Sequence, residues 1–415
     1  MPKSPVGILM LVENHYPQDT RVRNEANLLA SAGYRVSVVA LRETGQAAAE
    51  MVGGVMVYRV PRLELFKKTS SKRLGRAGRL FLKLKSSFGY LVEYCYFTAA
   101  CLAVASYVFL RHGFDVIHAH NPPDTLFLVV LPFKLFGRKF VFDHHDLCPE
   151  LYRSRYATGE GFHSRLLRLF EWCSLKMADV IIATNESYKK VEVERGKIDP
   201  ERIFIVRNGP NKARMASVTP SPRLRGMGKS ILCYVGSLNP QDGVDYLIRS
   251  LWHLVNILKR SDFYCVIMGS GDSLGDLRAL TSERALNGFV ELTGFVSEEE
   301  LQANLAAADI CVDPDPSSPL NDVSTWIKVM EYMAFAKPIV SFDLKETRFS
   351  AQDAAIYVQP NNEAEFAKAI VQMMDQPELR GKMGACGRRR VEDELQWSVV
   401  GKNLLTAYET LLAGK

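Results

Sequence analysis

Short apolar runs that alternate with helical stretches constrain the fold of this chain more than any other feature. Runs rich in valine and isoleucine, such as VGILMLV, RVSVVAL, FDVIHAH and DVIIAT, are separated by amphipathic stretches such as RVRNEANLLASAG and HSRLLRLFEWCSLKMA. Unbroken apolar strands with helices between them predict a parallel sheet that is covered on both faces. The first half of the chain therefore predicts an α/β domain.

The alternation stops at residues 209–230 and then restarts. This stretch carries three prolines and many bases without periodicity, so we interpret it as a linker. Because 415 residues exceed the ~250–300 residues at which single cores stop growing, we expect two domains. The predicted fold is α/β, with two tandem doubly wound, Rossmann-like domains that face a cleft. The expected parts are 1–208, the linker, 231–395, and a helix at 396–415 that crosses back to the first domain.

Charge and cysteine usage exclude several classes of protein. The net charge of +6 is too weak to name a partner. The eight cysteines show no Cys-x-x-Cys spacing, which argues against a zinc site or a disulfide framework and suits a reducing cytoplasm. The N-terminus, MPKSPVGILMLV, lacks the long apolar region and cleavage site of a signal peptide.

Polar residues gather at the predicted carboxyl ends of the strands in the first domain. His118 and His120 end one strand and, being two residues apart, share one face. The next strand ends in DHHD, and the first ends in ENHYPQDTR. A lone strand-end histidine is more often structural, but three neighbouring ends favour a ligand site at this edge. The candidates are His15, Asp19, Arg21, His118, His120, His145 and Asp146.

The stretch NDVSTWIKVMEYMAFAKPIV raises a separate question, because two charges interrupt an apolar segment. With a helix that starts near Ser324, the side chains of Ser324, Lys328 and Glu331 share one face. One interpretation is a surface helix with a Lys–Glu pair worth a few tenths of a kcal/mol. The other is a phosphate site at the helix N-terminus, with the glutamate accepting two ribose hydroxyls. Periodicity leaves both open.

Taken in order, these motifs resemble the GT-B glycosyltransferases, specifically the retaining family 4 enzymes. VMEYMAFAKPIV resembles the signature helix of the family, and YVGSLNPQDGVDYLI resembles the first strand and loop of its second domain. VRNG, VIMGSG and VELTGFVSEEELQANLAAADICVDP match in place and order, and QWSVVGKNLLTAYETLLAG resembles the C-terminal helix. The resemblance covers nearly the whole chain. It implies sugar transfer from a nucleotide-sugar, with no metal and no cofactor besides the donor.

The resemblance also implies roles for individual residues. It places His120, or less favourably His118, near the donor sugar as the catalytic histidine, and Glu331 at the ribose of the donor. His15, Asp19, Arg21, His118, His145 and Asp146 fall on the acceptor side. The implied donor-binding residues are Gly236, Ser237, Asn208, Phe295, Val296, Asn321, Asp322 and Ser324.

Three departures from the family pattern affect these expectations. The first glutamate of the signature pair is replaced by Val323, so either Asn321, Asp322 or backbone groups hold the sugar in its place, or the donor differs. The family's two phosphate-binding cations are replaced by Ser237 and Asp242, which makes Lys328 the expected catalytic cation. The N-terminal Gly-Gly is replaced by QDTR. We interpret the Asp-Pro-Asp sequence at 313–315, which resembles a metal motif of another fold, as a loop with chance spacing.

A basic run precedes a long apolar stretch in the first domain. The stretch Phe88–Leu110 contains one charge, Glu93, and is borderline for a span of ~20 residues. It is interpreted as a buried helix, an interfacial segment or, least favoured, a span. We favour peripheral contact with an anionic membrane surface on the cytoplasmic side. The basic residues are Lys67, Lys68, Lys72, Arg73, Arg76, Arg79, Lys83 and Lys85.

The expected function is transfer of a hexose, HexNAc or 6-deoxy-HexNAc from a UDP-sugar to a glycan acceptor. Enzymes of this pattern often extend lipid-linked glycans, so we expect a lipid-linked acceptor in cell-surface polysaccharide assembly. The alternatives are a GT-B-fold sugar-nucleotide epimerase and a basic nucleic-acid- or membrane-binding protein without transferase activity. Aromatic residues do not interleave with the basic run, which argues against nucleic acid as a partner.

Overall fold

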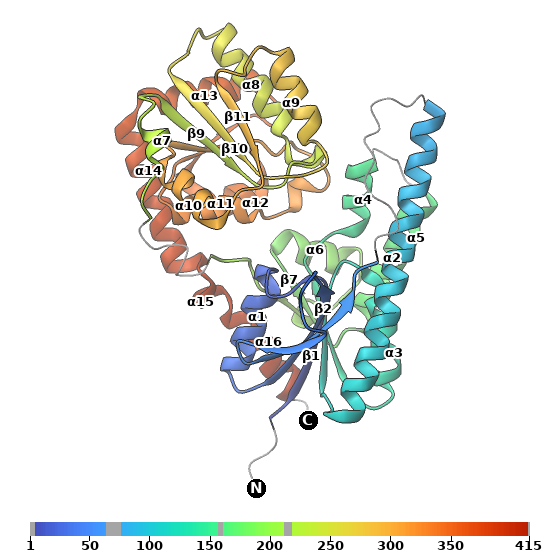
Figure 1. The fold of residues 1–415 in the computed structure, drawn as a ribbon. Helices are drawn as coiled ribbons and strands as arrows, with labels where there is room; N and C mark the ends of the chain where they lie inside the picture. Colours follow the sequence, from blue (N-terminus) through green and yellow to red (C-terminus); the bar gives the residue numbers. More distant parts are fainter. Residues whose placement is uncertain (1–4, 64–75, 157–160, 211–217, 414–415) are drawn as a thin grey trace. The chain divides into compact units, whose positions relative to one another are not determined.

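The computed structural model describes residues 5–63, 76–156, 161–210 and 218–413. The chain divides into two compact units, unit 1 being Met1–Val206 with Gly401–Lys415 and unit 2 being Arg207–Val400. Each unit is a parallel α/β sheet with helices on both faces, which confirms the predicted fold class. The elements are labelled in Figure 1.

The sheet of unit 1 has eight strands in the order β3-β4-β2-β1-β5-β6-β7-β8. All neighbours pair in parallel except β3 and β4, which form an antiparallel edge hairpin. Strand β2 pairs with one edge of β1, and the chain later returns to pair β5 with the opposite edge of β1. The topological switch point therefore lies between β1 and β5. The strands are β1 (Gly7–His15), β2 (Arg35–Arg42), β3 (Ala49–Val52), β4 (Val55–Pro61), β5 (Val116–His120), β6 (Lys139–His144), β7 (Val180–Ala183) and β8 (Ile203–Ile205).

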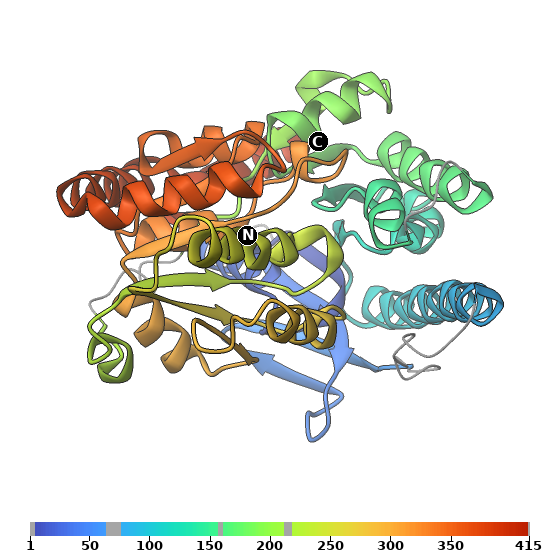
Figure 2. The ribbon, with the colours of Figure 1, turned by 90° about the horizontal axis from the view of Figure 1, so that it is seen from above.

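One helix of unit 1 is much longer than the others. Helix α2 spans 36 residues and is seen along its length in Figure 1 and nearly end-on in Figure 2. The C-terminal helix α16 belongs to unit 1, where it contacts β7 and β8. The helices of this unit are α1 (Thr20–Ser31), α2 (Arg76–Arg111), α3 (Phe127–Lys134), α4 (Cys148–Tyr156), α5 (Phe162–Met177), α6 (Glu186–Glu194) and α16 (Lys402–Ala413).

The sheet of unit 2 has six parallel strands in the order β11-β10-β9-β12-β13-β14, with its switch point between β9 and β12. The strands are β9 (Ser230–Val235), β10 (Phe263–Met268), β11 (Val290–Gly294), β12 (Ile310–Asp313), β13 (Ile339–Phe342) and β14 (Ala355–Val358). The helices are α7 (Pro222–Arg225), α8 (Val244–Asn256), α9 (Leu274–Glu283), α10 (Glu298–Ala307), α11 (Ile327–Ala334), α12 (Lys345–Ala351), α13 (Glu363–Asp375), α14 (Pro377–Arg390) and α15 (Trp397–Val400).

Alternate residues of one strand enter different cores of unit 2. In β9, Leu232 and Tyr234 pack on the face covered by α8, α9 and α13. Ile231 and Cys233 pack on the opposite face, against α10 and α11. Because both faces of the sheet are buried, its strands read as continuous apolar runs in the sequence.

The boundaries between the parts differ from those expected. The described parts of the expected linker, residues 209–210 and 218–230, belong to unit 2, where α7 packs on α10 and the backbone N–H of Ser221 donates to Ala303 O at 2.9 Å. The expected C-terminal helix is divided, since α15 lies in unit 2 and α16 in unit 1. Residues 218–230 therefore pack within unit 2, although their lack of periodicity predicted a linker.

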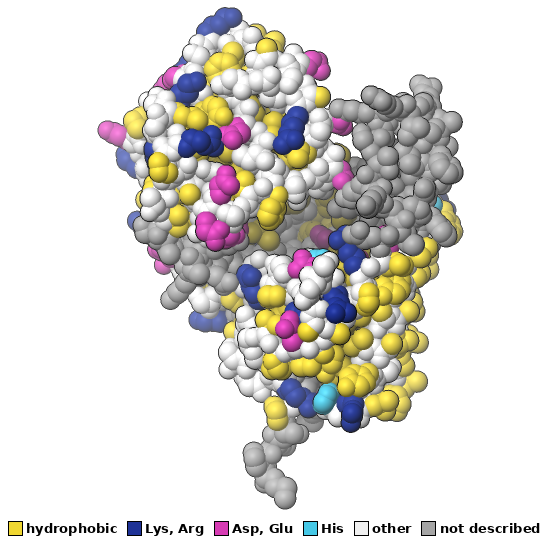
Figure 3. Space-filling view, viewed as in Figure 1, with side chains coloured by type: hydrophobic (Ala, Val, Ile, Leu, Met, Phe, Trp, Pro, Cys, Tyr) yellow, Lys and Arg dark blue, Asp and Glu magenta, His cyan; other side chains and the backbone are white. Residues whose placement is uncertain are grey.

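The apolar half of α2 is only partly covered. The segment Val92–Arg111 is long and apolar enough to cross a membrane by length and composition, and 28% of its apolar window is buried in the unit. Figure 3 shows apolar side chains gathered over the face of unit 1 that carries α2 and α3. We call this the α2–α3 face. Its exposed large apolar residues are Leu102, Tyr107, Leu110, Leu128, Leu131, Leu135 and Phe136.

The expected basic patch lies outside the described residues. Lys67, Lys68, Lys72 and Arg73 precede α2, and for Arg76, Arg79, Lys83 and Lys85 the structure describes the helical backbone alone. The patch therefore stays a prediction.

Candidate functional site

Four buried side chains meet at the switch point of unit 1, at the carboxyl edge of its sheet. Glu25 comes from α1, His118 and His120 from β5, and Asp143 from β6, and all four are 0% exposed. The two imidazole rings stack with centroids 4.3 Å apart, as their two-residue spacing predicts. The Nε2 atoms of His118 and His120 lie 3.7 and 3.8 Å from Oε2 of Glu25. His120 Nδ1 lies 3.1 Å from Asp143 Oδ2.

Arg21 supplies the positive charge of this cluster. Its Nε and Nη2 donate to the two carboxylate oxygens of Asp143 at 2.8 and 3.0 Å, and its Nη1 donates to Val206 O at 3.0 Å. Its Nε also lies 3.3 Å from Oε1 of Glu25. A bidentate pair of this kind is a strong one, and a buried charge requires such a partner. One guanidinium thus faces two buried carboxylates.

Burial and neighbouring charges set the protonation of the cluster. Burial, reinforced by Asp143, raises the pKa of Glu25 well above its ordinary value. Burial would also raise the pKa of Asp143, but the Arg21 guanidinium and two histidines outweigh it and hold that pKa well below its usual range. Burial lowers the pKa of His118 and of His120. Both imidazoles are therefore neutral at pH 7.

The side chain of His120 is fully enclosed in this conformation, and its ring nitrogens face two carboxylates. The catalytic role expected for it stays a prediction. His118 is equally enclosed, with Nδ1 3.0 Å from the hydroxyl of Tyr408 on α16. His145 is the member of this group that reaches the surface, since 21% of its side chain is exposed and its Nδ1 lies 3.4 Å from Asp143 Oδ1.

The other acceptor-side candidates make local structural contacts. Asp19 is the N-cap of α1, where its side chain accepts from the backbone N–H of Val22 at 3.0 Å. His15 is half-buried, with Nδ1 3.3 Å from a carbonyl of β2. Asp146 is half-exposed, and its backbone N–H donates to Asn121 Oδ1 at 3.1 Å.

A second buried charge cluster lies at the switch point of unit 2. Lys328, on α11, forms an ion pair with Asp315, and its Nζ lies 3.3 Å from Oδ1 of Asp313. The ammonium also lies 4.9 Å from the ring centroid of Tyr234 and 5.2 Å from that of Trp326. Only 8% of Lys328 is exposed, and the two carboxylates are 1% and 0% exposed. The lysine is therefore held between two carboxylates and two aromatic rings.

This arrangement bears on two expectations about unit 2. The Asp-Pro-Asp sequence is no chance spacing, because both of its carboxylates hold Lys328. In this structure the ammonium of Lys328 contacts these two carboxylates, and its expected contact with a diphosphate stays a prediction. Burial would lower the pKa of Lys328, and Asp315, the larger of the opposing influences, instead raises it well above its ordinary value. Burial in turn raises the pKa of Asp315 despite the lysine.

Helix α11 begins three residues later than expected. It starts at Ile327, because residues 321–323 form a 3-10 turn and the hydroxyl of Ser324 donates to Leu320 O at 2.8 Å. Asn321 is buried and donates from Nδ2 to the carbonyl oxygens of Gln241 and Pro316, each at 2.8 Å. These two candidates therefore shape the loop before α11. Asp322 is half-buried and accepts from a serine hydroxyl at 3.2 Å.

The carboxyl edge of the sheet in unit 2 depends on glycine. A Cβ on Gly269 would lie 1.7 Å from Gly236 O, so the turns after β9 and β10 approach too closely for any side chain. Gly243 has φ +65°, and a Cβ there would lie 2.0 Å from Pro314 O. The loop after β9 thus packs directly on the Asp-Pro-Asp segment. The backbone at Gly236 and the exposed Ser237 border the same edge.

The remaining donor-side candidates are accessible. Phe295 follows β11 at the carboxyl edge and is 86% exposed, so its ring is open to a ligand. Val296, Glu331 and Asn208 are half-exposed. The N-cap of α11, Trp326, makes no side-chain cap hydrogen bond, so the first backbone N–H groups of the helix are not satisfied by a cap.

Five residues of the two clusters were missed by sequence reasoning. Glu25 had a local signal, since it lies four residues after Arg21 on one helix face. Asp143 had one too, since it ends the same strand as the histidines of DHHD. Asp313 and Asp315 were seen but dismissed. Tyr408 lies 290 residues from His118 and carries no local signal.

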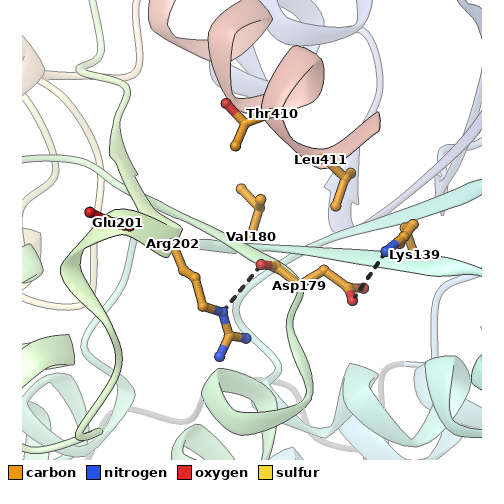
Figure 4. Close-up of a pocket in the computed structure, with 7 residues that line it drawn as sticks. All are labelled: Lys139, Asp179, Val180, Glu201, Arg202, Thr410 and Leu411. Carbon is orange, nitrogen blue, oxygen red and sulfur yellow. Dashed lines mark hydrogen bonds and ion pairs between the residues drawn. The ribbon is translucent and has the colours of Figure 1, made fainter. Parts of the chain in front are cut away.

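A cavity of about 290 Å³ lies elsewhere in unit 1. Figure 4 shows Asp179 between Lys139 and Arg202, with Leu411 and Thr410 of α16 above them. Lys139 and Val180 begin their strands, so the cavity lies at the amino edge of the sheet, opposite the histidine cluster. It is therefore separate from the site predicted at the carboxyl edge.

Comparisons with known proteins agree with the fold. A family model for "Glycosyl transferase 4-like domain" matches residues 18–209, and one for "Glycosyl transferases group 1" matches residues 229–376. The solved structure of a sucrose-phosphate synthase from Thermosynechococcus elongatus superposes with a TM-score of 0.77 at 18% identity and covers 99% of this chain and 100% of its own. An Anabaena protein in complex with UDP and glucose gives a TM-score of 0.71 at 13% identity, covering 98% and 100%.

A curated relative is similar over a shorter stretch. It is the "GDP-mannose-dependent monoacylated alpha-(1-6)-phosphatidylinositol monomannoside mannosyltransferase" of Corynebacterium glutamicum, 29% identical over 172 residues, which are 40% of this chain and 44% of that protein. The chain spans less than half the length of the first curated relatives that it matches. The two family models together cover well over half of the chain, one in each unit. The chain therefore belongs to the group 1, family 4-like glycosyltransferases and has their GT-B fold.

Proposed function

We propose that the protein is a retaining glycosyltransferase that moves a hexose, HexNAc or 6-deoxy-HexNAc from a UDP-sugar to a glycan acceptor. The observation that carries this proposal is the carboxyl edge of unit 2, where glycine turns, an exposed phenylalanine and the start of α11 lie at one sheet edge. Family membership supports the class of reaction, and the Anabaena structure supports UDP as the nucleotide.

Each part of the donor has a candidate partner at this edge. Phe295 would stack on the nucleobase, Glu331 would accept the two ribose hydroxyls, and the backbone at Gly236 with Ser237 would border the diphosphate. The first N–H groups of α11 would stabilise the charge that builds on the diphosphate as the glycosidic bond breaks. Because Lys328 is neutralised by two aspartates, backbone dipoles carry this task in the proposal.

On the acceptor side, the proposal assigns a positioning contact to His145 rather than His120. His145 is partly exposed, and burial lowers its pKa less than the hydrogen bond and charge of Asp143 raise it. A raised pKa favours the imidazolium, which can hold the acceptor by donating a hydrogen bond to an oxygen that does not react, while the attacking hydroxyl passes its proton to the departing diphosphate. The buried carboxylate beside it holds the ring in place.

The test is a panel of nucleotide-sugars added to the full chain while its thermal unfolding is followed. A ligand at 100 times its Kd stabilises by about 2.7 kcal/mol, so the true donor should raise the melting temperature clearly. The same mixtures are then analysed for products without an acceptor. Interconversion of the sugar-nucleotide would indicate an epimerase, whereas stability of the donor until an acceptor is added supports transfer. No shift with any nucleotide-sugar contradicts the proposal.

We further propose that the acceptor is lipid-linked and that the protein lies on the cytoplasmic face of the membrane, serving cell-surface polysaccharide assembly. Two features of unit 1 support this: the basic run at 67–85 and the exposed α2–α3 face. Basic residues near an anionic surface contribute on the order of 1 kcal/mol each, and exposed apolar side chains add a contribution that salt does not screen.

Two matched variants separate these contributions on anionic vesicles. Reversing Lys72, Arg73, Arg76 and Arg79 to glutamate should release the protein at low salt and slow transfer to a lipid-linked acceptor, while transfer to a short soluble acceptor is nearly spared. Leu110→Ser with Leu135→Ser should weaken the binding that persists at high salt. Equal sedimentation of parent and both variants would contradict the membrane proposal while leaving the donor site untouched.

A further inference from the structure

The two central strands of unit 2 separate before they end at its switch point. Their parallel register ends at Cys233 and Cys311, whereas β9 continues to Val235 and β12 to Asp313. On its other edge β9 stays paired with β10 as far as Val235. In the described sheet, Val235 therefore has no partner strand on the side of β12, and a buried N–H or C=O needs a hydrogen-bond partner.

The hydroxyl of Tyr332, on α11, takes the place of the partner strand. The N–H of Val235 donates to it at 2.9 Å, and the hydroxyl oxygen lies 3.4 Å from the carbonyl oxygen of the same residue and 3.3 Å from that of Val312 on β12. Tyr332 is 0% exposed, and burial raises the pKa of its hydroxyl well above the ordinary value, so it keeps its proton. One side chain thus joins β9, β12 and α11.

This contact links the two halves of the proposed donor site. Glu331, the neighbour of Tyr332 on α11, is the proposed ribose contact, and Gly236, which follows Val235, borders the proposed diphosphate site. The turn at Gly236 is itself fixed to the end of β10, since its N–H donates to Met268 O at 3.1 Å. The Tyr332 hydroxyl therefore sets the separation between the helix that would hold the ribose and the turn that borders the diphosphate.

The ring of Tyr332 has a separate role from its hydroxyl. It belongs to the apolar core on the face of the sheet that α10 and α11 cover, together with Cys233 and Val329. A phenylalanine would keep this packing and lose the contacts to Val235 and Val312 alone. Replacing this tyrosine by phenylalanine therefore isolates what the hydroxyl does.

We propose that Tyr332 is a positioning residue for the donor, whose hydroxyl fixes the spacing between the ribose contact and the diphosphate contact. Ligands that span both halves of the site, such as UDP, depend on this spacing, whereas uridine, which occupies the ribose half alone, does not. The inference rests on the proposed function, since it concerns the same site. A tyrosine that only stabilised the fold would change the free energy of unfolding and leave both affinities as they are.

The test compares the full parent chain with Tyr332→Phe. Calorimetric titration should show an affinity for UDP about 10-fold lower in the variant, while the affinity for uridine, followed by ligand-observed NMR, stays within about twofold. Leu254→Val supplies the control, because it alters a buried residue near the end of α8 and should lower stability without changing the affinity for UDP. A parent that binds no UDP contradicts the proposed function. A parent that binds UDP, with a variant that binds it equally well or loses both ligands equally, overturns the positioning role.

Hydrogen exchange supplies a second test that needs no variant. Because the N–H of Val235 donates to the Tyr332 hydroxyl, its exchange reports how often that contact opens. Ligand binding and this contact are coupled reciprocally, so saturating UDP should slow exchange in the parent peptide that contains Val235 by about 10-fold, and saturating uridine by less than about twofold. Exchange that UDP leaves unchanged, or that both ligands slow alike, overturns the proposal even where Tyr332→Phe does not fold.

Discussion

The two units place buried charge at the same point of the fold but enclose it differently. In unit 2, one lysine is held by two aspartates and two aromatic rings. In unit 1, one arginine faces two carboxylates, and three histidines lie within reach of them. Imidazoles can take or give a proton near neutral pH, whereas the rings of unit 2 cannot.

The comparison shows two ways in which charged residues are placed at a switch point: enclosed by partners in unit 2, and extended to the surface in unit 1. In unit 2 the charge cluster is closed, and the proposal leaves glycine backbone, a helix start, Phe295 and Glu331 at the edge for a ligand. In unit 1 the cluster includes imidazoles beside its carboxylates, and His145 extends it to the surface. A charged side chain at a switch point is therefore weak evidence for contact with substrate until its own partners are known.

The largest expected effect comes from breaking the closed cluster. Lys328→Met leaves two buried aspartates without a cation and should lower the free energy of unfolding by about 3–5 kcal/mol. Adding Asp315→Asn should recover most of the loss, because it removes the unbalanced charge. Chemical denaturation of the parent, single and double variants measures both steps. A single variant as stable as the parent would show that the ion pair is absent in solution.

Replacing Arg21 in unit 1 should lower the free energy of unfolding less than replacing Lys328 does. Arg21→Met removes the bidentate partner of Asp143, but His145, whose pKa is raised beside that carboxylate, can protonate and partly compensate it, so we expect a loss of about 2–3 kcal/mol. The loss should shrink as the pH falls toward 6, where the histidines protonate more readily. Denaturation at pH 6 and 8 tests this, and a loss that matches Lys328→Met at both values would remove the distinction between the clusters.

A separate buried charge group in unit 1, centred on His144, makes the stability of the fold depend on pH. Burial would lower the pKa of His144, but the hydrogen bond to Glu192 at 3.0 Å and the charge of Glu171 raise it to about 9. The group is protonated in the fold, so its contribution is full below an unfolded pKa near 6.5 and is lost as the pH rises through about 9.

The expected loss between pH 6.5 and 9 is on the order of 2–3 kcal/mol. His144→Gln should flatten this part of the stability curve, and His112→Gln, at an exposed position, should leave it unchanged. Unfolding curves at pH 6, 7.5 and 9 supply the comparison. The same slope in the parent and in His144→Gln would mean that another group carries it.

The smallest effect is expected at the open edge of unit 2. Phe295→Ala removes an 86% exposed ring, so the stability of the fold should stay within ±0.5 kcal/mol. Binding of UDP should weaken by about 0.5–1.5 kcal/mol, as for loss of one aromatic contact. Calorimetric titration measures the change, and unaltered affinity would mean that the base does not lie on this ring.

Local patterns predicted much of the fold and part of the site. Continuous apolar strands predicted the two parallel sheets, because both of their faces are buried. The two-residue spacing of His118 and His120 predicted their common face. The edge hairpin at β3 was not predicted, since the strand AEMV is short and exposed.

The partners of the charged residues could not be predicted from the sequence. Lys328 meets Asp313 and Asp315 because β12 and α11 are adjacent in space, and His118 meets Tyr408 because α16 returns to unit 1 after the whole of unit 2. Such contacts depend on which elements the fold brings together, and not on the spacing of residues along the sequence. A charged residue in an apolar segment indicates that partners exist, but not which residues they are.

The central claim is that the edge of unit 2, and not the Lys328 charge, holds the nucleotide. Calorimetric titration of UDP onto the parent, Glu331→Gln and the double variant Lys328→Met/Asp315→Asn tests it most directly. The account predicts that Glu331→Gln loses about 10-fold or more in affinity through weaker hydrogen bonds to the ribose, while the double variant stays within about threefold of the parent. Loss of UDP binding in the double variant, with Glu331→Gln unaffected, would contradict it.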